Sequence, residues 1–338
     1  MRCGGGRCFQ QLSGGSFRGW GRGDSLLSLR RADVDATCPT FDANPAEALT
    51  RCSMEPASTY VEVAGVRYHV RRIGDGPPVL LLHGFPETGE SYARNWSALV
   101  AAGRTVLVPD LKGYGQTDKP RPGTVKGDYR VRSLSLELGE LIEALGHDSM
   151  DVVGHDWGGI LLSAMMRTCR HRIRKAVLLN APFRRFLPWR PRHVYFFNLP
   201  ELPERRFWRK PIEFVTQIIR YWSVRPEVFS AEDIRCMTRA LQQDGSISCA
   251  FAYYRGLRKD LPFMARAILG GLGENEAPET LIIWGTGDPV LPTSVGRMAH
   301  KDLPGSRLEL IEGAGHFVHR EAADRVNPLL AAFLSAAS

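Results

Sequence analysis

The residues most suited to carry out a reaction lie in segment 154–159, which reads Gly-His-Asp-Trp-Gly-Gly. This segment follows the apolar run at 151–153 and precedes an apolar helical stretch. Small residues around a reactive side chain, between a strand and a helix, are typical of a nucleophile elbow, because the turn is too tight for bulk. The side chain presented at the end of the sheet would be that of Asp156. An aspartate here can also simply cap the helix, so the segment alone leaves both interpretations open.

Three other candidate residues follow predicted strands, in the order that such chemistry needs. His83 comes after a buried run and opens the segment His83–Pro86, where a backbone N–H of an oxyanion hole is expected. Asp288 comes after the strand that ends at Trp284, and His316 comes after the last strand. The chain order of nucleophile, acid and histidine is that of enzymes with a nucleophile elbow. The four placements together favour a catalytic site over a plain structural turn.

A carboxylate at the elbow favours a different reaction from a serine. Its attack on a carbonyl gives an easily reversed anhydride, whereas its attack on a saturated carbon gives an ester between substrate and enzyme. The histidine, in its neutral form, would then activate water to hydrolyse that ester. The backbone N–H groups of Phe85 and Trp157 would stabilise the resulting oxyanion. The sequence therefore predicts a covalent route through Asp156, with Phe85 and Trp157 as the oxyanion hole.

The elements that must position these residues alternate between strands and helices. Segments 60–63 and 66–70 flank Ala64-Gly65 and predict a β-hairpin. Apolar runs predict buried strands at 79–82, 105–108, 151–153, 176–179, 280–284 and 308–311. Helical stretches lie between them, and 322–336 is the last. This alternation predicts an α/β fold with a mainly parallel sheet, helices on both faces and an antiparallel edge supplied by the hairpin.

Residues 183–270 interrupt the alternation, because helical stretches occur there without any buried-strand run. We therefore expect a core of residues 54–182 and 271–338, with 183–270 forming a helical lid over the carboxyl ends of the strands. Residues 183–222 hold eleven aromatic residues, and nine Lys/Arg against three Glu, a balance of +6. This basic stretch is either a solvated surface or a region that attracts anionic substrates or lipid.

Residues 1–53 differ in composition from the rest of the chain. They contain glycine runs, lack the apolar core of a secretory signal, and hold no acidic residue before position 24. The segment fits either an organelle transit peptide or an untranslated leader before Met54, and we expect it to be disordered and unnecessary for activity.

No apolar stretch is long enough to span a membrane. Cys169, Cys236 and Cys249 are scattered like reduced cysteines, so we expect a soluble cytoplasmic protein, with organelle import as the alternative.

The motifs resemble those of the α/β-hydrolase superfamily and, within it, the epoxide hydrolases, over about residues 59–336. The most specific segments are 83–87 (HGFPE), 109–115 (PDLKGYG), 154–159 (GHDWGG), 253–255 (YYR) and 315–318 (GHFV). The resemblance implies the α/β-hydrolase fold with an inserted lid. It also implies that Asp156 is the nucleophile, His316 the base and Asp288 the acid that orients the base.

Epoxide hydrolases also resemble one another in two lid tyrosines that donate protons to the opening ring. Tyr254 matches the second of these. The family spacing places the first at His193, and Tyr195 is the nearest tyrosine. The resemblance therefore implies Tyr254 and Tyr195 as acids, with His193 as the alternative to Tyr195.

The predicted function is hydrolysis of an epoxide to a vicinal diol through an Asp ester. A haloalkane or haloacetate dehalogenase would use the same nucleophile, but fluoroacetate dehalogenases carry arginines where this chain has Trp157 and Ile160. A non-catalytic binding protein on the same fold is a third interpretation.

The aromatic lid favours a small apolar or aryl epoxide, with water as second substrate, and the basic stretch admits epoxides that bear a carboxylate. Seven cysteines without a C-x-x-C pair predict no zinc site, and we expect no cofactor, no metal and no nucleic-acid partner.

Overall fold

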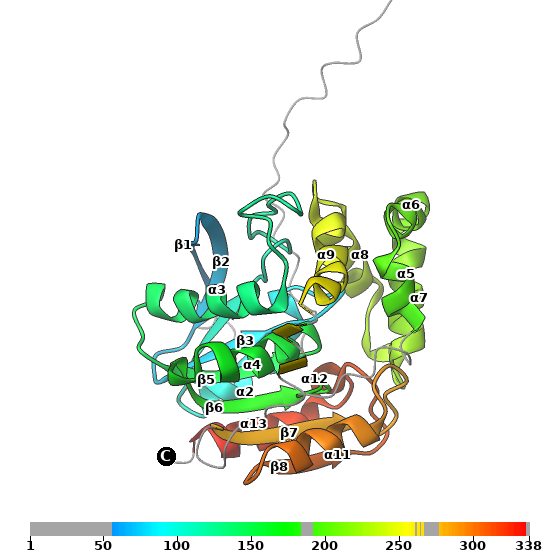
Figure 1. Cartoon of the computed structure of the whole chain (residues 1–338). Coiled ribbons are helices and arrows are strands. Elements are labelled where there is room, and N and C mark those ends of the chain that lie inside the picture. The colour runs from blue at the N-terminus through cyan, green and yellow to red at the C-terminus, as the bar shows by residue number, and fades with distance from the viewer. Residues whose placement is uncertain (1–55, 184–191, 261, 264, 267–276, 336–338) are drawn as a thin grey trace, which may run out of the picture. The chain divides into compact units, whose positions relative to one another are not determined.

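An eight-stranded sheet organises the protein (Figure 1). The computed structural model describes residues 56–183, 192–260, 262–263, 265–266 and 277–335. The spatial order of the strands is β1-β2-β4-β3-β5-β6-β7-β8. Their bounds are β1 Ala57–Val63, β2 Val66–Ile73, β3 Pro78–Leu82, β4 Thr105–Pro109, β5 Met150–His155, β6 Ile173–Leu179, β7 Glu279–Gly285 and β8 Arg307–Ile311. Each predicted strand is therefore present.

The hairpin forms the antiparallel edge that the sequence predicted. Strands β1 and β2 pair antiparallel, and β2 pairs antiparallel with β4, whereas the pairs from β4 through β8 are parallel. The turn residues Ala64 and Gly65 have φ angles of 51° and 73°. Two successive residues with positive φ are the backbone of the tight turn that matches the twist of a hairpin.

Helices cover both faces of the sheet, because successive residues of its central strands point to opposite sides. Leu80 and Leu82 of β3 pack with helices α3, α4 and α11, whereas Val79 and Leu81 pack with α2 and α13. The bounds of the covering helices are α2 Trp96–Ala101, α3 Val131–Ala144, α4 Trp157–Thr168, α11 Thr293–Asp302 and α13 Ala323–Ser335. Strands buried on both faces explain the continuous apolar runs of the sequence.

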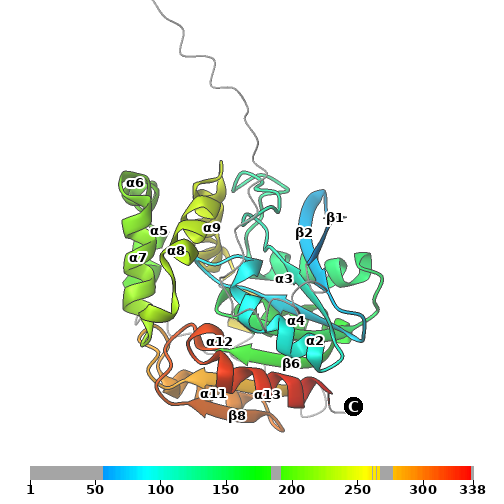
Figure 2. The same cartoon turned by 180° about the vertical axis from the view of Figure 1, so that it is seen from behind.

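A group of helices between β6 and β7, here called the helical insertion, stands apart from the covering helices (Figures 1 and 2). Its members are α5 Arg192–Asn198, α6 Leu202–Arg209, α7 Pro211–Trp222, α8 Ala231–Gln242 and α9 Ser246–Lys259. Helix α8 begins at a capping box in which Ser230 and Asp233 each accept a backbone N–H of the other. Helix α9 contacts both α5 and α3, so it links the insertion to the core.

Some expectations are corrected or lie outside the described residues. Cys169 and Cys249 are free and buried, as expected, but Cys236 is disulfide-bonded, so the expectation of a reduced thiol is wrong there. The predicted leader at 1–53 and the predicted insertion residues at 184–191 and 267–270 are not described. Among the described residues, no helix combines the length and the apolar character needed to cross a membrane.

Candidate active site

Asp156 occupies a strained turn between β5 and α4. Its φ of 49° lies in the left-handed region. This conformation is unfavourable for any residue that has a side chain, so the surrounding structure must hold Asp156 in it. Gly158 is packed so closely that a Cβ there would lie 2.1 Å from the carbonyl oxygen of Leu82. A Cβ on Gly84 would lie 2.4 Å from the Cβ of Asp156. The glycines are thus required for the elbow, as the sequence predicted, and the carboxyl group stands at the end of β5.

The loop after β3 delivers a backbone donor to this carboxylate. The N–H of Phe85 donates to Asp156 Oδ1 at 2.9 Å. His83 fixes the loop, because its Nε2 accepts the N–H of Leu111 at 2.9 Å and its Nδ1 lies 3.0 Å from the carbonyl oxygen of Gly84. Burial lowers the pKa of His83, which agrees with a neutral ring that donates through Nδ1. Trp157, the other predicted donor, is the first residue of α4.

The structure brings the three candidate triad residues together. His316 Nδ1 lies 2.8 Å from Asp288 Oδ2, and its Nε2 lies 3.4 Å from Asp156 Oδ2. Asp156 therefore uses one oxygen for the Phe85 N–H and turns the other toward the imidazole. Burial alone would lower the pKa of His316, but the two carboxylates outweigh it and raise this pKa to about 10. The two carboxylates therefore favour the charged form of the imidazole in the resting site.

Asp288 is held by groups that satisfy both of its oxygens. Oδ1 accepts the N–H groups of Val290 and Leu291 at 2.7 and 2.9 Å. Oδ2 accepts Asn180 Nδ2 at 2.6 Å, in addition to its contact with His316. Asn180 follows β6 with a φ of 43°, and its Oδ1 accepts the N–H of Gly285 at 2.9 Å. An asparagine suits this position, because it tolerates positive φ better than most side chains and offers both a donor and an acceptor.

Two further buried side chains hold the backbone that carries His316. His155 Nε2 lies 2.9 Å from the carbonyl oxygen of His316. Glu321 accepts the N–H of Gly315 at 2.9 Å and that of Phe317 at 3.1 Å. It also accepts the N–H groups of Val224 and Arg225, which follow α7. Glu321 therefore joins the His316 loop to the helical insertion.

Aromatic side chains from the core and the insertion surround the carboxylate. The ring of Tyr254 stands edge-on to Trp157 at 4.9 Å and to Phe85 at 5.9 Å between centroids. Its hydroxyl is buried with no hydrogen-bond partner among the described residues. Burial, followed by the charge of Asp156, raises the pKa of Tyr254 well above its usual value. The hydroxyl therefore keeps its proton and remains free to donate it.

Of the two candidates for the first lid position, the structure brings His193 to the site. Its ring lies 4.5 Å from Trp222 and 5.8 Å from Tyr254 between centroids, and Trp222 in turn lies 5.5 Å from His316. Burial lowers the pKa of His193 to about 4, so its imidazole is neutral at pH 7. Tyr195 is two residues further along α5, and 56% of it is exposed to solvent.

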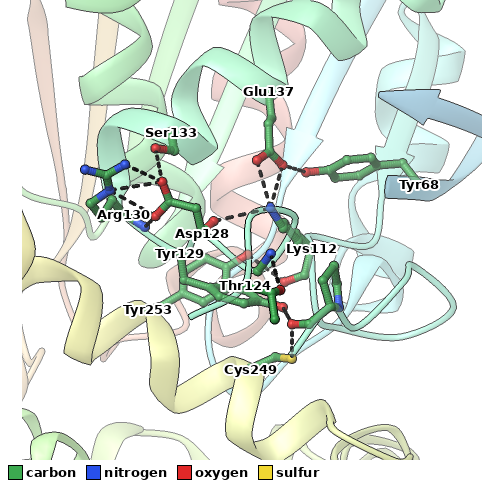
Figure 3. A network of polar contacts seen from close by, with 12 residues as sticks. Tyr68, Lys112, Thr124, Asp128, Tyr129, Arg130, Ser133, Glu137, Cys249 and Tyr253 are labelled. Carbon is green, nitrogen blue, oxygen red and sulfur yellow. Dashed lines mark hydrogen bonds and ion pairs between the residues drawn. The ribbon is translucent and has the colours of Figure 1, made fainter. Parts of the chain in front are cut away.

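A buried polar network fixes the helix that carries Tyr254 (Figure 3). Lys112 Nζ contacts Glu137 of α3 at 2.8 and 3.1 Å, and Tyr68 of β2 donates to the same carboxylate at 2.9 Å. The hydroxyl of Tyr253 donates to the carbonyl oxygen of Lys112 at 2.8 Å. Because Tyr253 precedes Tyr254 in α9, this bond sets the position of the helix above the core.

A pocket of about 320 Å³ lies within the insertion and borders the site at His193 and Trp222. Its lining is largely apolar and aromatic, and Arg206 and Gln217 add polar groups. The remaining lining residues are Phe196, Phe197, Phe214, Ile218 and Tyr221. Such a surface suits an apolar molecule with few polar groups.

The comparisons with known proteins agree with this geometry. The profile described as alpha/beta hydrolase fold matches residues 77–323. The chain is 29% identical over 290 residues to AB hydrolase superfamily protein YfhM of Bacillus subtilis, which covers 81% of the chain and 96% of that protein. It is also 29% identical over 336 residues to Epoxide hydrolase 3 of Xenopus tropicalis, which covers 92% of the chain and 86% of that protein.

The chain belongs to the α/β-hydrolase fold family. It is a hydrolase, and the resemblance of its motifs to those of epoxide hydrolases is confirmed by relatives of that name. The solved structure of the epoxide hydrolase CorEH matches it with a TM-score of 0.72 at 24% identity, over 82% of this chain and 98% of that one. At that identity the likeness supports the fold alone.

Sequence reasoning missed several residues that hold the site of this hydrolase. Asn180 is not a residue type that suggests catalysis, although its place directly after a buried strand puts it at the edge where the site lies. His155 lies inside the elbow motif directly before Asp156, and its contact with the carbonyl oxygen of His316 joins it to a loop far away in the sequence. Glu321 gives no side-chain signal, because the groups that donate to it are backbone N–H groups, of Gly315 nearby and of Val224 far away in the sequence.

The substitution Asn180→Asp tests how far Asp288 depends on its amide donor. It keeps the acceptor for Gly285 but turns the donor into a second carboxylate beside Asp288. We expect kcat to fall about tenfold, the size of one lost hydrogen bond to a charged group. The loss should grow at higher pH, where both carboxyl groups are ionised. Asn327→Asp, in α13, is the matched control, and an Asn180→Asp enzyme with the wild-type rate at every pH would contradict this role.

Proposed function

We propose that the chain hydrolyses epoxides to vicinal diols through an ester on Asp156. The observation that carries the proposal is the environment of this carboxylate. One of its oxygens accepts the N–H of Phe85, the other faces His316, and the unpartnered hydroxyl of Tyr254 is packed nearby. A carboxylate nucleophile together with a protonated phenol suits attack on a carbon whose leaving oxygen needs a proton.

In the first step, Asp156 Oδ2 attacks one ring carbon of the epoxide. A bond forms between Oδ2 and that carbon, and the carbon–oxygen bond of the ring breaks, so its electron pair goes to the ring oxygen. Tyr254 gives this oxygen its proton, and the tyrosinate recovers a proton from solvent later in the cycle. The product of the step is a hydroxyalkyl ester of Asp156.

In the second step, His316 takes a proton from water, and the hydroxide attacks the ester carbonyl carbon. The charge develops on Oδ1, where the N–H of Phe85 already donates and the N–H of Trp157 adds a second donor. Collapse breaks the bond between Cγ and Oδ2, so Oδ2 leaves in the diol after taking the proton from His316, and the water oxygen replaces it on Asp156. The new carboxylic acid then gives its proton to His316, which restores the carboxylate.

The charge of Asp156 couples the two steps. Burial opposes the charged form of His316, whereas Asp288 and Asp156 together raise its pKa to about 10. Esterification removes the charge of Asp156 and with it one of the two partners, so the pKa of His316 falls. His316 then releases its proton to solvent, so it becomes a base only after the covalent intermediate has formed.

We assign the helical insertion the role of a lid, and His193 and Tyr254 the role of its two polar groups over the substrate. Support comes from the ring contact between them at 5.8 Å and from the exposure of Tyr195. A neutral imidazole can orient the ring oxygen while Tyr254 supplies the proton. The aromatic pocket beside His193 favours apolar or aryl epoxides. The name of the relative Epoxide hydrolase 3 agrees with this substrate class.

The reaction itself is tested by offering the enzyme aryl epoxides and haloacetates in parallel. We expect a vicinal diol from the epoxide and no halide from the haloacetate, since Trp157 and Ile160 replace the arginines that would bind its carboxylate. Diol is measured by chromatography and halide by a selective electrode. Halide release without diol would identify a dehalogenase instead.

The variant His316→Gln separates the two steps. The first should proceed and the second should stall, so the intact mass should rise by that of one substrate molecule. In the wild-type enzyme the same adduct should accumulate as pH falls, because the histidine of the intermediate becomes protonated and cannot serve as a base. Mass spectrometry of the quenched reaction measures both effects. Substrate consumption by the variant without any adduct would contradict the ester.

The neighbours Tyr254 and Tyr253 allow a matched test of the proton donor. Tyr254→Phe removes a buried hydroxyl that has no described partner, so we expect an unfolding free energy about 1–3 kcal/mol higher and a 10²- to 10⁴-fold lower rate of ring opening. Tyr253→Phe removes a buried hydrogen bond, so we expect about 1 kcal/mol lower unfolding free energy with most of the activity kept. Denaturant unfolding and single-turnover kinetics measure the two effects. The reverse pattern would rule out Tyr254 as the donor.

A further inference from the structure

A second cluster of polar side chains lies outside the proposed chemistry. Glu87 follows the loop that carries Phe85, His155 ends β5, and His319 lies in α12 (Val318–Glu321). Each is at most 1% exposed to solvent. Burying three polar side chains in one place costs free energy unless each makes a hydrogen bond or binds an ion. The role of the cluster therefore depends on what these side chains bind.

The ligand atoms of the cluster converge on one point. Glu87 Oε2 lies 3.2 Å from His155 Nδ1 and 3.5 Å from His319 Nε2. The three atoms all lie within 4.8 Å of one another. Neighbouring ligands of a tetrahedral metal with bonds of about 2.0–2.1 Å are separated by roughly 3.3 Å. The two distances from Glu87 bracket that separation.

The only partners of these atoms among the described residues are one another. Both oxygens of Glu87, His155 Nδ1 and both ring nitrogens of His319 make no hydrogen bond of good geometry there, and Glu87 Oε2 meets the two rings only in ion-pair contacts. His155 Nε2 faces the carbonyl oxygen of His316 at 2.9 Å, so this nitrogen must be the one that donates. In the neutral ring Nδ1 is then a bare lone pair that faces a carboxylate. A proton on Nδ1 or a metal ion between the two groups removes this conflict, and the test below separates the two.

The orientation of His155 is that of a metal-binding ring. A ring that binds through one nitrogen and donates from the other to a carbonyl oxygen is the usual arrangement around a bound metal. His155 Nε2 faces the carbonyl oxygen of His316, which leaves Nδ1 facing Glu87.

We propose that Glu87, His155 and His319 bind one divalent transition-metal ion of the zinc class, with water as the fourth ligand. Two imidazoles and one carboxylate form a set that Zn²⁺ accepts. Glu87 lies two residues after Phe85, His155 directly before Asp156, and His319 three residues after His316. The metal therefore ties together the three segments that carry the oxyanion donor, the nucleophile and the base, and its role is to hold them in place.

The test is metal binding by the full chain, freed of any purification tag and expressed in zinc- or cobalt-supplemented medium so that the ion enters during folding. Elemental analysis should find one zinc per chain. The cobalt form should show the visible bands of a tetrahedral ion without the near-ultraviolet charge-transfer band that cysteine ligands give. Loaded protein should melt about 5 °C above protein stripped with a chelator.

His319→Gln is the informative variant, because glutamine keeps a polar side chain of similar length and removes the imidazole ligand. We expect it to fold, to lose the bound metal and the cobalt bands, and to melt at the same temperature with and without chelator. His171→Gln, at an exposed position, is the control and should bind like the wild type. Wild-type protein without metal, or equal metal in the wild type and His319→Gln, would overturn the proposal. Neither readout requires turnover, so the outcome is independent of the reaction proposed above.

Discussion

The contact between the carboxylate of Asp156 and the imidazole of His316 is the interaction on which the rest of the site depends. Both groups are buried, and taking a pair of charges out of water costs free energy unless further hydrogen bonds satisfy them. The required donors are backbone N–H groups and one amide, supplied by the loops that follow the strands. Phe85 serves Asp156, and Asn180 serves Asp288, which in turn faces His316. The ends of neighbouring parallel strands are where such loops meet.

This dependence explains why so much polar structure lies behind the carboxylate. The carbonyl oxygen of His316 is bonded to His155, and the N–H groups around it are bonded to Glu321. If either bond were lost, a buried backbone group would be left without a partner. The same groups therefore stabilise the loop and aim the imidazole. Glu321 also accepts two N–H groups after α7, so the position of the helical insertion depends on the loop that carries the base.

The sequence predicted the parts whose signal is local. Each buried strand and the hairpin turn at Ala64-Gly65 follow from patterns within a few residues, and all were found. Asp156, Asp288 and His316 could be named because each follows a strand, and strand ends meet at one edge. Asn180 could not be given a role, since its partners Gly285 and Asp288 are distant in sequence. Glu321 could not either, since it accepts backbone N–H groups, which leave no mark in a sequence pattern. The choice between His193 and Tyr195 depended on the rotation of α5, which aromatic packing decides and a sequence pattern does not.

The adjacent residues Tyr253 and Tyr254 illustrate how stability and reactivity are divided within one turn of α9. The hydroxyl of Tyr253 is bonded to Lys112, whose ammonium group is bonded to Glu137, so this tyrosine anchors the helix to the core (Figure 3). The hydroxyl of Tyr254 is equally buried but has no described partner, which costs about 1–3 kcal/mol in a folded protein. A fold that only needed packing at this position would accept phenylalanine. A substrate oxygen that accepts the proton of Tyr254 would supply the missing partner, which explains why the hydroxyl is unsatisfied in the free protein. The hydrogen bond of Tyr253 holds α9, and with it Tyr254, in the position that this contact needs.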